Sequence, residues 1–234
     1  MLIQTVFLDA GGVLVNPNWS RVSDTLSRHG VTAAAAALAA AEPHAKKRLD
    51  TGDSVSATND EQRGWTYFNL VLTEAGVTLS NATASALAEL RAYHQEFNLW
   101  ESVPDEVHPA LAALRTRGFK LVVVSNANGR LRYLFDRLGL SGSLDALFDS
   151  YDEGVEKPDP RFFRRALERT GCEAQSTIHV GDFYHIDVAG ARAAGITPAL
   201  LDVAGLYPDC DCLRVGSLNE LVDVLGAKIA TTHG

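Results

Sequence analysis

The chain has 234 residues, 46% of them hydrophobic and 21% charged, so it can bury the core of one large domain or of a core domain with a modest insert. Its formal net charge of -8 argues against a general nucleic-acid binder, because neutralising phosphates requires clustered Lys and Arg. Three cysteines without framework spacing, and a short N-terminal apolar run with no basic segment before it, predict a cytoplasmic protein without an export signal or membrane span.

The first predicted element is a buried strand over residues 3–8. This run is mostly apolar, contains β-branched and aromatic residues, and stops at Asp9-Ala-Gly-Gly. In open α/β sheets ligands bind outside the carboxyl ends of the strands, so Asp9 is a candidate to contact a substrate or a metal. The same residue types also make ordinary turns, and this stretch alone does not decide between the two readings.

Residues 16–95 contain only helical patterns. Apolar residues at helical spacing predict helices over 20–29, 33–42, 61–75 and 83–97, and Pro43 is expected to interrupt the second of them. We therefore expect a second, helical domain inserted after the first strand, which can act as a lid. Its aromatic residues Trp65, Tyr67 and Phe68 are more typical of a core than of a substrate pocket.

From residue 104 onward, helices and strands alternate. The pattern predicts helices over 106–118, 131–138, 161–170, 188–194 and 218–225, and strands over 120–124, 147–150, 177–180 and 198–203. Such alternation predicts a parallel sheet covered on both faces. The fold class is therefore α/β, with a Rossmann-like parallel core formed by residues 1–15 and 96–234 and a helical insert over 16–95.

Polar side chains follow three of the predicted strands directly. These are Asp9, Ser125-Asn126 and Gly181-Asp182, and Lys157 lies in a Pro-bounded loop just before a helix. A carboxylate can attack as a nucleophile, a hydroxyl and an amide can bind equatorial oxygens, a lysine can neutralise charge, and a second carboxylate can hold Mg²⁺. Together they supply the parts that phosphoryl chemistry needs.

Four stretches in this order resemble the haloacid dehalogenase superfamily of hydrolases, in particular its members with a helical cap after the first strand. They read FLDAGGVL at 7–14, VVSN at 123–126, EKPDP at 156–160 and VGDFYHIDVAGARAAG at 180–195. The resemblance extends over the whole chain, and the cap region over 16–95 matches in length and helical character alone. It implies a Mg²⁺-dependent phosphatase that acts on a small phosphorylated metabolite.

The resemblance also implies a role for each residue of the first three motifs. Asp9 would be the nucleophile that forms an aspartyl intermediate. Ser125 and Asn126 would bind the transferred group, and Lys157 would orient Asp9 and stabilise charge.

The fourth motif resembles a metal site. By this resemblance Asp182 would bind Mg²⁺ together with Asp9 and the backbone carbonyl of Gly11, and Asp187 would support Lys157 or metal-bound water. Outside this motif set, Lys157 and Asp187 would be read as a surface ion pair that contributes little.

Gly11 departs from the family pattern. Phosphatases of the superfamily normally carry a second aspartate there, which protonates the leaving group and then activates water. Losing acid/base help costs typically about 10²–10⁴-fold, so turnover of poor leaving groups should be slow. His185, beside the metal carboxylates in the fourth motif, is a candidate substitute, whereas the other histidines are read as structural or surface residues.

The same departure keeps other functions open. Dehalogenases of the superfamily also lack the second aspartate and work without metal, and a phosphonate-cleaving relative uses a cap lysine as an imine-forming amine. Lys46 and Lys47 lie in the expected cap, although such a pair is typical of a solvated helix face. A third alternative is a fold that binds a phosphorylated ligand or a protein partner without catalysis. Neither the substrate nor the oligomeric state follows from the sequence.

Overall fold

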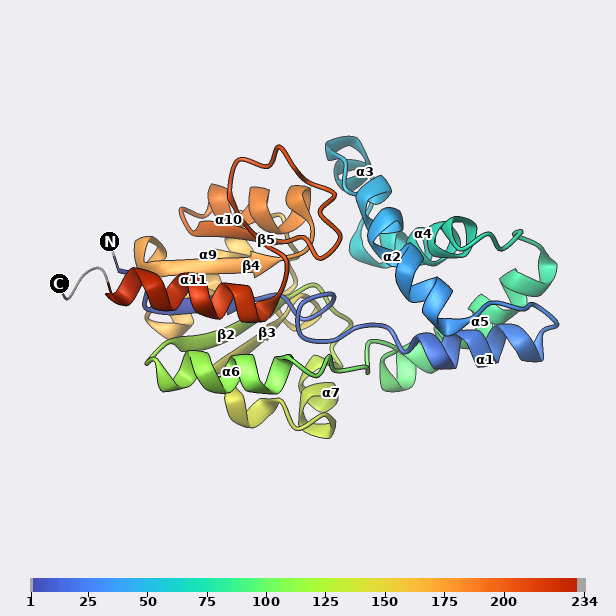
Figure 1. Cartoon of the computed structure of the whole chain (residues 1–234), viewed down its shortest axis with the longest axis horizontal. Helices are drawn as coiled ribbons and strands as arrows, with labels where there is room; N and C mark the ends of the chain where they lie inside the picture. Colours follow the sequence, from blue (N-terminus) through green and yellow to red (C-terminus); the bar gives the residue numbers. More distant parts are fainter. Residues whose placement is uncertain (1, 231–234) are drawn as a thin grey trace. The chain divides into compact units, whose positions relative to one another are not determined.

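The structure is a computed structural model that describes residues 2–230, and the chain divides into two compact units. The first, here called the core unit, comprises Met1–Asn16 and Val103–Gly234, and the second, the helical unit, comprises Pro17–Ser102 (Figure 1). The domain boundary expected at residue 95 falls inside the last helix of the helical unit, Asn81–Phe97. Each unit is described by itself below.

The core unit is built on a parallel sheet of six strands in the order β3-β2-β1-β4-β5-β6 (Figure 1). The strands are β1 Thr5–Leu8, β2 Lys120–Ser125, β3 Ala146–Asp149, β4 Thr177–Gly181, β5 Thr197–Leu201 and β6 Leu213–Val215. All neighbouring strands are parallel, which confirms the predicted α/β class with a Rossmann-like core. The strand order reverses its direction at β1, and this switch point is where open α/β sheets bind their ligands.

Helices cover both faces of this sheet. They are α6 Val107–Thr116, α7 Leu131–Arg137, α8 Ser150–Glu153, α9 Pro160–Thr170, α10 Ala189–Ala193 and α11 Leu218–Ala230. On one face Phe7 and Val122 pack in a single buried cluster with Phe162, Phe163 and side chains of α10. Alternate strand residues point the other way, toward the face where α6 and α11 pack together (Figure 1).

The helical unit consists of α1 Trp19–Arg28, α2 Ala35–Leu49, α3 Gly52–Ala57, α4 Asp60–Glu74 and α5 Asn81–Phe97. The expectation that Pro43 interrupts the second helix is wrong, because α2 continues through it. Proline removes one backbone donor, but the buried face formed by Leu38, Ala41, Ala45 and Leu49 holds the helix against its neighbours.

Aromatic rings fill the interior of the helical unit. Phe68 lies edge-on to Trp19 and Trp100, with ring centroids 6.0 and 5.7 Å away, and Tyr67 stacks on Trp100 at 6.1 Å. Tyr67 and Phe68 are buried, so these rings serve as core. Within the described residues, every helix is too short or too polar to cross a bilayer.

Candidate active site

The strand register brings Asp9 and the ends of β2 and β4 to one edge of the sheet. Leu8 pairs with Val123 of β2 on one side and with Val180 of β4 on the other. The Asp9 backbone N–H still donates to the Val180 carbonyl, at 2.9 Å, so the ladder reaches one residue further. Asp9 therefore leaves the central strand beside the residues that lead into Ser125 and Asp182.

The loop after β1 fixes the Asp9 carboxylate. The Ala10 carbonyl accepts hydrogen bonds from the backbone N–H groups of Leu14 and Val15, at 2.8 and 2.9 Å, which closes a tight turn. Gly12 adopts a φ of 74° in this turn, a conformation that favours glycine. The Ala10 N–H then points back and donates to Asp9 Oδ1 at 2.8 Å.

Lys157 lies between two carboxylates. Its Nζ is 2.8 Å from Asp9 Oδ1 and 2.7 Å from Asp187 Oδ1, and the side chain is 1% exposed. Burial would by itself lower the pKa of Lys157, but the charges of Asp187 and Asp9 hold the pKa above its ordinary value. The structure thus places a permanent ammonium against Asp9.

Asn126 binds the backbone that carries Lys157. Its Nδ2 donates to the Lys157 carbonyl at 3.0 Å, and its Oδ1 accepts from the Lys157 N–H at 2.7 Å. This pair of bonds fixes the lysine loop against the end of β2. Ser125 is buried at the strand end, with Oγ 3.4 Å from the Asn126 carbonyl. That Ser125 and Asn126 bind the transferred group remains a prediction.

Asp187 is held over the end of β4. The π-helix Tyr184–Val188 precedes α10, where the sequence predicted a helix from Val188 alone, and it carries Asp187 back toward the strand. A Cβ on Gly181 would lie 2.0 Å from Asp187 Cγ, so this approach requires glycine. Asp187 Oδ2 accepts from the Phe183 N–H at 3.1 Å. Burial alone would raise the pKa of Asp187. The Lys157 charge and the His179 hydrogen bond lower this pKa by more than burial raises it, so the net shift is downward.

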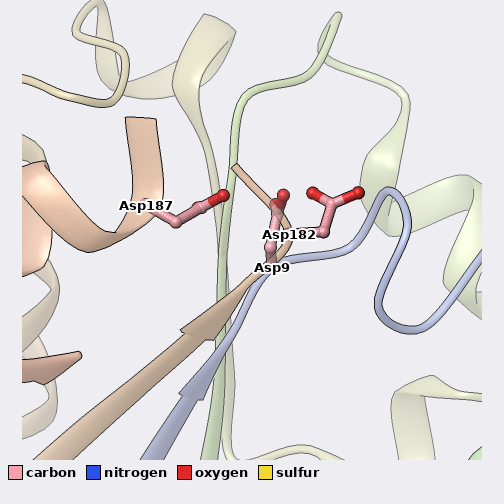
Figure 2. A group of neighbouring side chains, drawn as sticks. All are labelled: Asp9, Asp182 and Asp187. Carbon is pink, nitrogen blue, oxygen red and sulfur yellow. The ribbon is translucent and has the colours of Figure 1, made fainter. Parts of the chain in front are cut away.

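Three carboxylates gather at this edge. Asp9, Asp182 and Asp187 each offer one oxygen, and these oxygens all lie within 4.8 Å of one another (Figure 2). Figure 2 draws Asp9, which follows β1, between Asp182 and Asp187, which both follow β4. Counted over these three carboxylates and the Lys157 ammonium alone, the formal charge has an excess of two negative charges (three carboxylates less one ammonium).

This donor set fits a divalent cation with hard oxygen ligands, such as Mg²⁺. Asp187 already accepts hydrogen bonds from Lys157, from His179 and from the Phe183 N–H, so it suits a supporting role. Asp9 and Asp182 as the metal ligands, with the Gly11 carbonyl as a third, remain predictions.

His185 lies in the same π-helix as Asp187. It is partly buried, and its ring packs edge-on against Tyr184 with centroids 5.3 Å apart. Its role as the substitute acid remains a hypothesis.

Two contacts of the site, those of His179 and Asn126, were not predicted from the sequence. His179, read as a structural or surface residue, is fully buried with Nε2 3.0 Å from Asp187 Oδ1. The Asn126 bonds to the Lys157 backbone are the second. A signal for His179 existed, since it lies two residues before Gly181 and hence on the same face of β4.

Known proteins resemble this chain in sequence and in fold. The family model for haloacid dehalogenase-like hydrolases matches residues 3–195. The haloacid dehalogenase-like hydrolase domain-containing protein 3 of Bos taurus is 36% identical over 135 residues, covering 58% of this chain and 53% of that protein. The phosphoserine phosphatase of Thermus thermophilus is 35% identical over 159 residues, covering 66% of this chain and 61% of that protein. The chain thus spans between half and two thirds of these relatives' length.

A solved structure shows the same fold. The putative HAD-hydrolase YfnB from Bacillus subtilis, bound to magnesium, superposes with a TM-score of 0.69 at 18% identity, covering 96% of this chain and 99% of that one. The fold and the family match together define a hydrolase with a Rossmann-like core. The chain belongs to the haloacid dehalogenase-like hydrolase family.

Proposed function

We propose that this chain is a Mg²⁺-dependent phosphatase that acts on a small phosphorylated metabolite through an aspartyl-phosphate on Asp9. The observation that carries the proposal is the buried Lys157 ammonium, 2.8 Å from Asp9 and 2.7 Å from Asp187, beside the further carboxylate of Asp182. The likeness to a phosphoserine phosphatase supports the choice of a phosphate ester as substrate. The helical unit would serve as the cap.

The two oxygens of Asp9 have different partners, which supports different tasks for them in the proposed reaction. In the described part of the chain, the hydrogen bonds from Lys157 and from the Ala10 N–H both end on Oδ1, which leaves Oδ2 to attack phosphorus. The new oxygen–phosphorus bond forms as the bond to the leaving oxygen breaks. Water then attacks the same phosphorus, phosphate departs, and the Asp9 carboxylate is restored.

Lys157 and the carboxylates balance charge in this scheme. The ammonium stays protonated because its pKa is raised, so it can stabilise the phosphoryl oxygens without giving up a proton. Mg²⁺ held by Asp9, Asp182 and the Gly11 carbonyl would neutralise the remaining negative charge of the site and of the phosphoryl group.

Gly11 limits which substrates react well. With no carboxyl group at this position, the leaving oxygen must take its proton from solvent or from another group such as His185. We therefore propose that esters with good leaving groups, such as aryl or acyl phosphates, are hydrolysed faster than alkyl phosphates.

Gly11 is also the observation that favours a second candidate, a 2-haloacid dehalogenase, because halide leaves without a proton. The excess negative charge at Asp9, Asp182 and Asp187 argues for the metal-dependent phosphatase instead. Of the two lysines considered for the phosphonate alternative, Lys46 loses support, because its Nζ is 2.8 Å from the buried Glu42 carboxylate. An ammonium held in this way is a poor imine-forming amine.

Phosphate release from an activated aryl phosphate, with and without Mg²⁺, tests the proposal, and halide release from a 2-haloacid is its counter-assay. Metal-dependent phosphate release supports the phosphatase, and metal-independent halide release would replace it with the dehalogenase. A Gly11→Asp variant should raise turnover of alkyl phosphates relative to aryl phosphates.

The three cysteines are free, which agrees with the reducing cytoplasm as the place of action.

A further inference from the structure

A buried histidine lies beside the Lys157–Asp187 pair. His179 is in the middle of β4 with an exposed fraction of 0%, and its ring packs edge-on against Phe163 with centroids 4.8 Å apart. Its Nε2 is 3.0 Å from Asp187 Oδ1, the same oxygen that accepts from Lys157 Nζ at 2.7 Å. Oδ1 of Asp187 therefore lies within hydrogen-bond distance of two nitrogen atoms, one from Lys157 and one from His179.

The surroundings of the His179 ring determine which nitrogen carries the proton. Nε2 faces a carboxylate that can only accept, so Nε2 is the donor. Nδ1 is buried, and in the described part of the chain it has no hydrogen-bond partner. A proton on Nδ1 would be a buried donor without an acceptor, which is unfavourable. The ring is therefore the Nε2–H tautomer.

Lys157 needs a fixed acceptor to stay in place. Its ammonium is at the end of a flexible four-carbon chain, and Asp187 could rotate its carboxylate away. The Phe183 N–H holds Oδ2 of that carboxylate, at 3.1 Å, but Oδ1 is the oxygen that meets the ammonium. Besides Lys157 itself, His179 is the donor that holds Oδ1 in the described structure.

We propose that His179 is a positioning residue, whose Nε2–H fixes Asp187 Oδ1 and thereby holds the Lys157 ammonium against Asp9. The chain of contacts runs from His179 through Asp187 and Lys157 to Asp9 Oδ1, with donor–acceptor distances of 3.0, 2.7 and 2.8 Å. The expected effect on turnover rests on the proposed phosphatase function, whereas the effect on Lys157 does not.

Three variants separate positioning from packing. His179→Leu keeps an apolar side chain of similar size without a donor, and His179→Gln returns an amide N–H close to the place of Nε2. Ile178→Val is the matched control, since Ile178 is buried in the same strand and points to its other face. If His179→Leu does not fold, His179→Asn takes its place, because its shorter amide does not reach Asp187.

The first readout is the kinetics of aryl phosphate hydrolysis with Mg²⁺. We expect His179→Leu to lower kcat by about 10- to 100-fold while KM changes little, as for other residues that orient a functional group. His179→Gln should recover most of kcat, and Ile178→Val should match the native protein. Equal losses in the Leu and Gln variants, or unchanged kcat in His179→Leu, would overturn the proposal.

The second readout is hydrogen exchange of the Lys157 ammonium, followed by NMR on protein with ¹⁵N-labelled lysine. The native protein and His179→Gln should show slow exchange, and His179→Leu should exchange faster by about tenfold or more, because the ammonium is released more often. Unchanged exchange in His179→Leu contradicts the positioning role even if no ester is turned over. Faster exchange in a protein without turnover would refute the phosphatase and support the contact chain.

Discussion

Both units of the chain pair a lysine with a buried carboxylate, yet the two pairs differ in how buried the lysine is and in what surrounds it. In the core unit Lys157 lies 2.7 Å from Asp187, and both side chains are 1% exposed. In the helical unit Lys46 lies 2.8 Å from Glu42, with the side chains 16% and 10% exposed. Distance and charge type are the same in both places.

One cation and two neutral donors contact the Glu42 carboxylate. It accepts from Trp19 Nε1 at 3.2 Å and from Tyr67 Oη at 2.8 Å, and Lys46 is four residues away on the same helix. This arrangement joins α1, α2 and α4. The Lys46 ammonium balances the charge of the Glu42 carboxylate, and Trp19 and Tyr67 add two neutral donors to it.

Lys157 pairs with two carboxylates, one more than its single charge balances. Asp9 and Asp187 both pair with this ammonium, and Asp182 lies with them in one carboxylate cluster at the strand ends where the sheet reverses its order. An ion pair with low exposure therefore does not by itself mark a functional site. An excess of like charge at a topological switch point is the stronger indication.

The largest expected effect comes from removing each lysine in turn. Lys157→Met leaves two carboxylates without their cation and should destabilise the core unit by about 3–5 kcal/mol. Lys46→Met leaves Glu42 with two neutral donors and should cost about 1 kcal/mol or less. Urea unfolding of both variants measures the difference. Losses of equal size would mean that the two ion pairs contribute equally to the free energy of unfolding.

A smaller effect is expected from the glycine that admits Asp187. Gly181→Ala places a Cβ 2.0 Å from Asp187 Cγ, so the carboxylate must move away from Lys157. We expect a loss of stability of about 3 kcal/mol and a fall in turnover of about 10²-fold. Thermal unfolding and aryl phosphate hydrolysis measure the two effects. A variant with native stability and turnover would show that the Asp187 position is dispensable.

The two units should also respond differently to acid. Burial lowers the pKa of His94 in the helical unit to about 4, and the Leu99 N–H donates to its Nδ1 at 3.1 Å. Because the unfolded state binds this proton more readily, stability present near neutral pH is lost as pH falls from about 6.5 to about 4. Between pH 7 and pH 5 the loss should reach about 2 kcal/mol.

The core unit has the same sign of dependence at Asp187, but in a lower pH range. The pKa of Asp187 is held below its ordinary 3.8, so the stability it contributes is present above that value and is lost only at lower pH. Unfolding of the native chain and of His94→Asn at pH 7 and pH 5 tests whether His94 causes the loss of stability in this pH range. If His94→Asn keeps the full loss between these two pH values, His94 is not its source.

The smallest expected effect is a gain. Gly64 lies inside α4, and a Cβ there would meet no atom within 4 Å. Gly64→Ala should therefore stabilise the helical unit by about 0.5–1 kcal/mol by lowering the entropy of the unfolded chain. As the counterpart of Gly181→Ala, it should leave turnover unchanged. Thermal unfolding that shows destabilisation would contradict this reading of α4.

Much of the fold could be predicted because its signals are local. Apolar runs that stop at polar residues identified five of the strands and put Asp9, Ser125 and Asp182 at their ends. The sixth strand, Leu213–Val215, was missed because it is three residues long and carries Arg214 at its centre. The continuation of α2 through Pro43 depends on packing with other helices, which a local pattern does not contain.

The resemblance implied that Lys157 orients Asp9 and that Asp187 supports Lys157, but the contacts of Asn126 and His179 could not be predicted. Asn126 meets the Lys157 backbone across 31 positions, which no local pattern contains. His179 in a strand interior looks like any buried histidine until the π-helix brings Asp187 to it. The family motifs indicated the chemically active residues and the support of Lys157 by Asp187, but not the contacts that Asn126 and His179 make.

The nucleophilic role of Asp9 is the claim on which this account depends most, and phosphate release by the native chain and Asp9→Asn, with Mg²⁺, tests it directly. Acid quenching during turnover, followed by mass spectrometry, should find a phosphoryl group on the peptide that contains Asp9. The variant should lose about 10⁴-fold or more of the rate and carry no phosphoryl group. Metal-dependent turnover that survives in Asp9→Asn would contradict an aspartyl-phosphate at this residue.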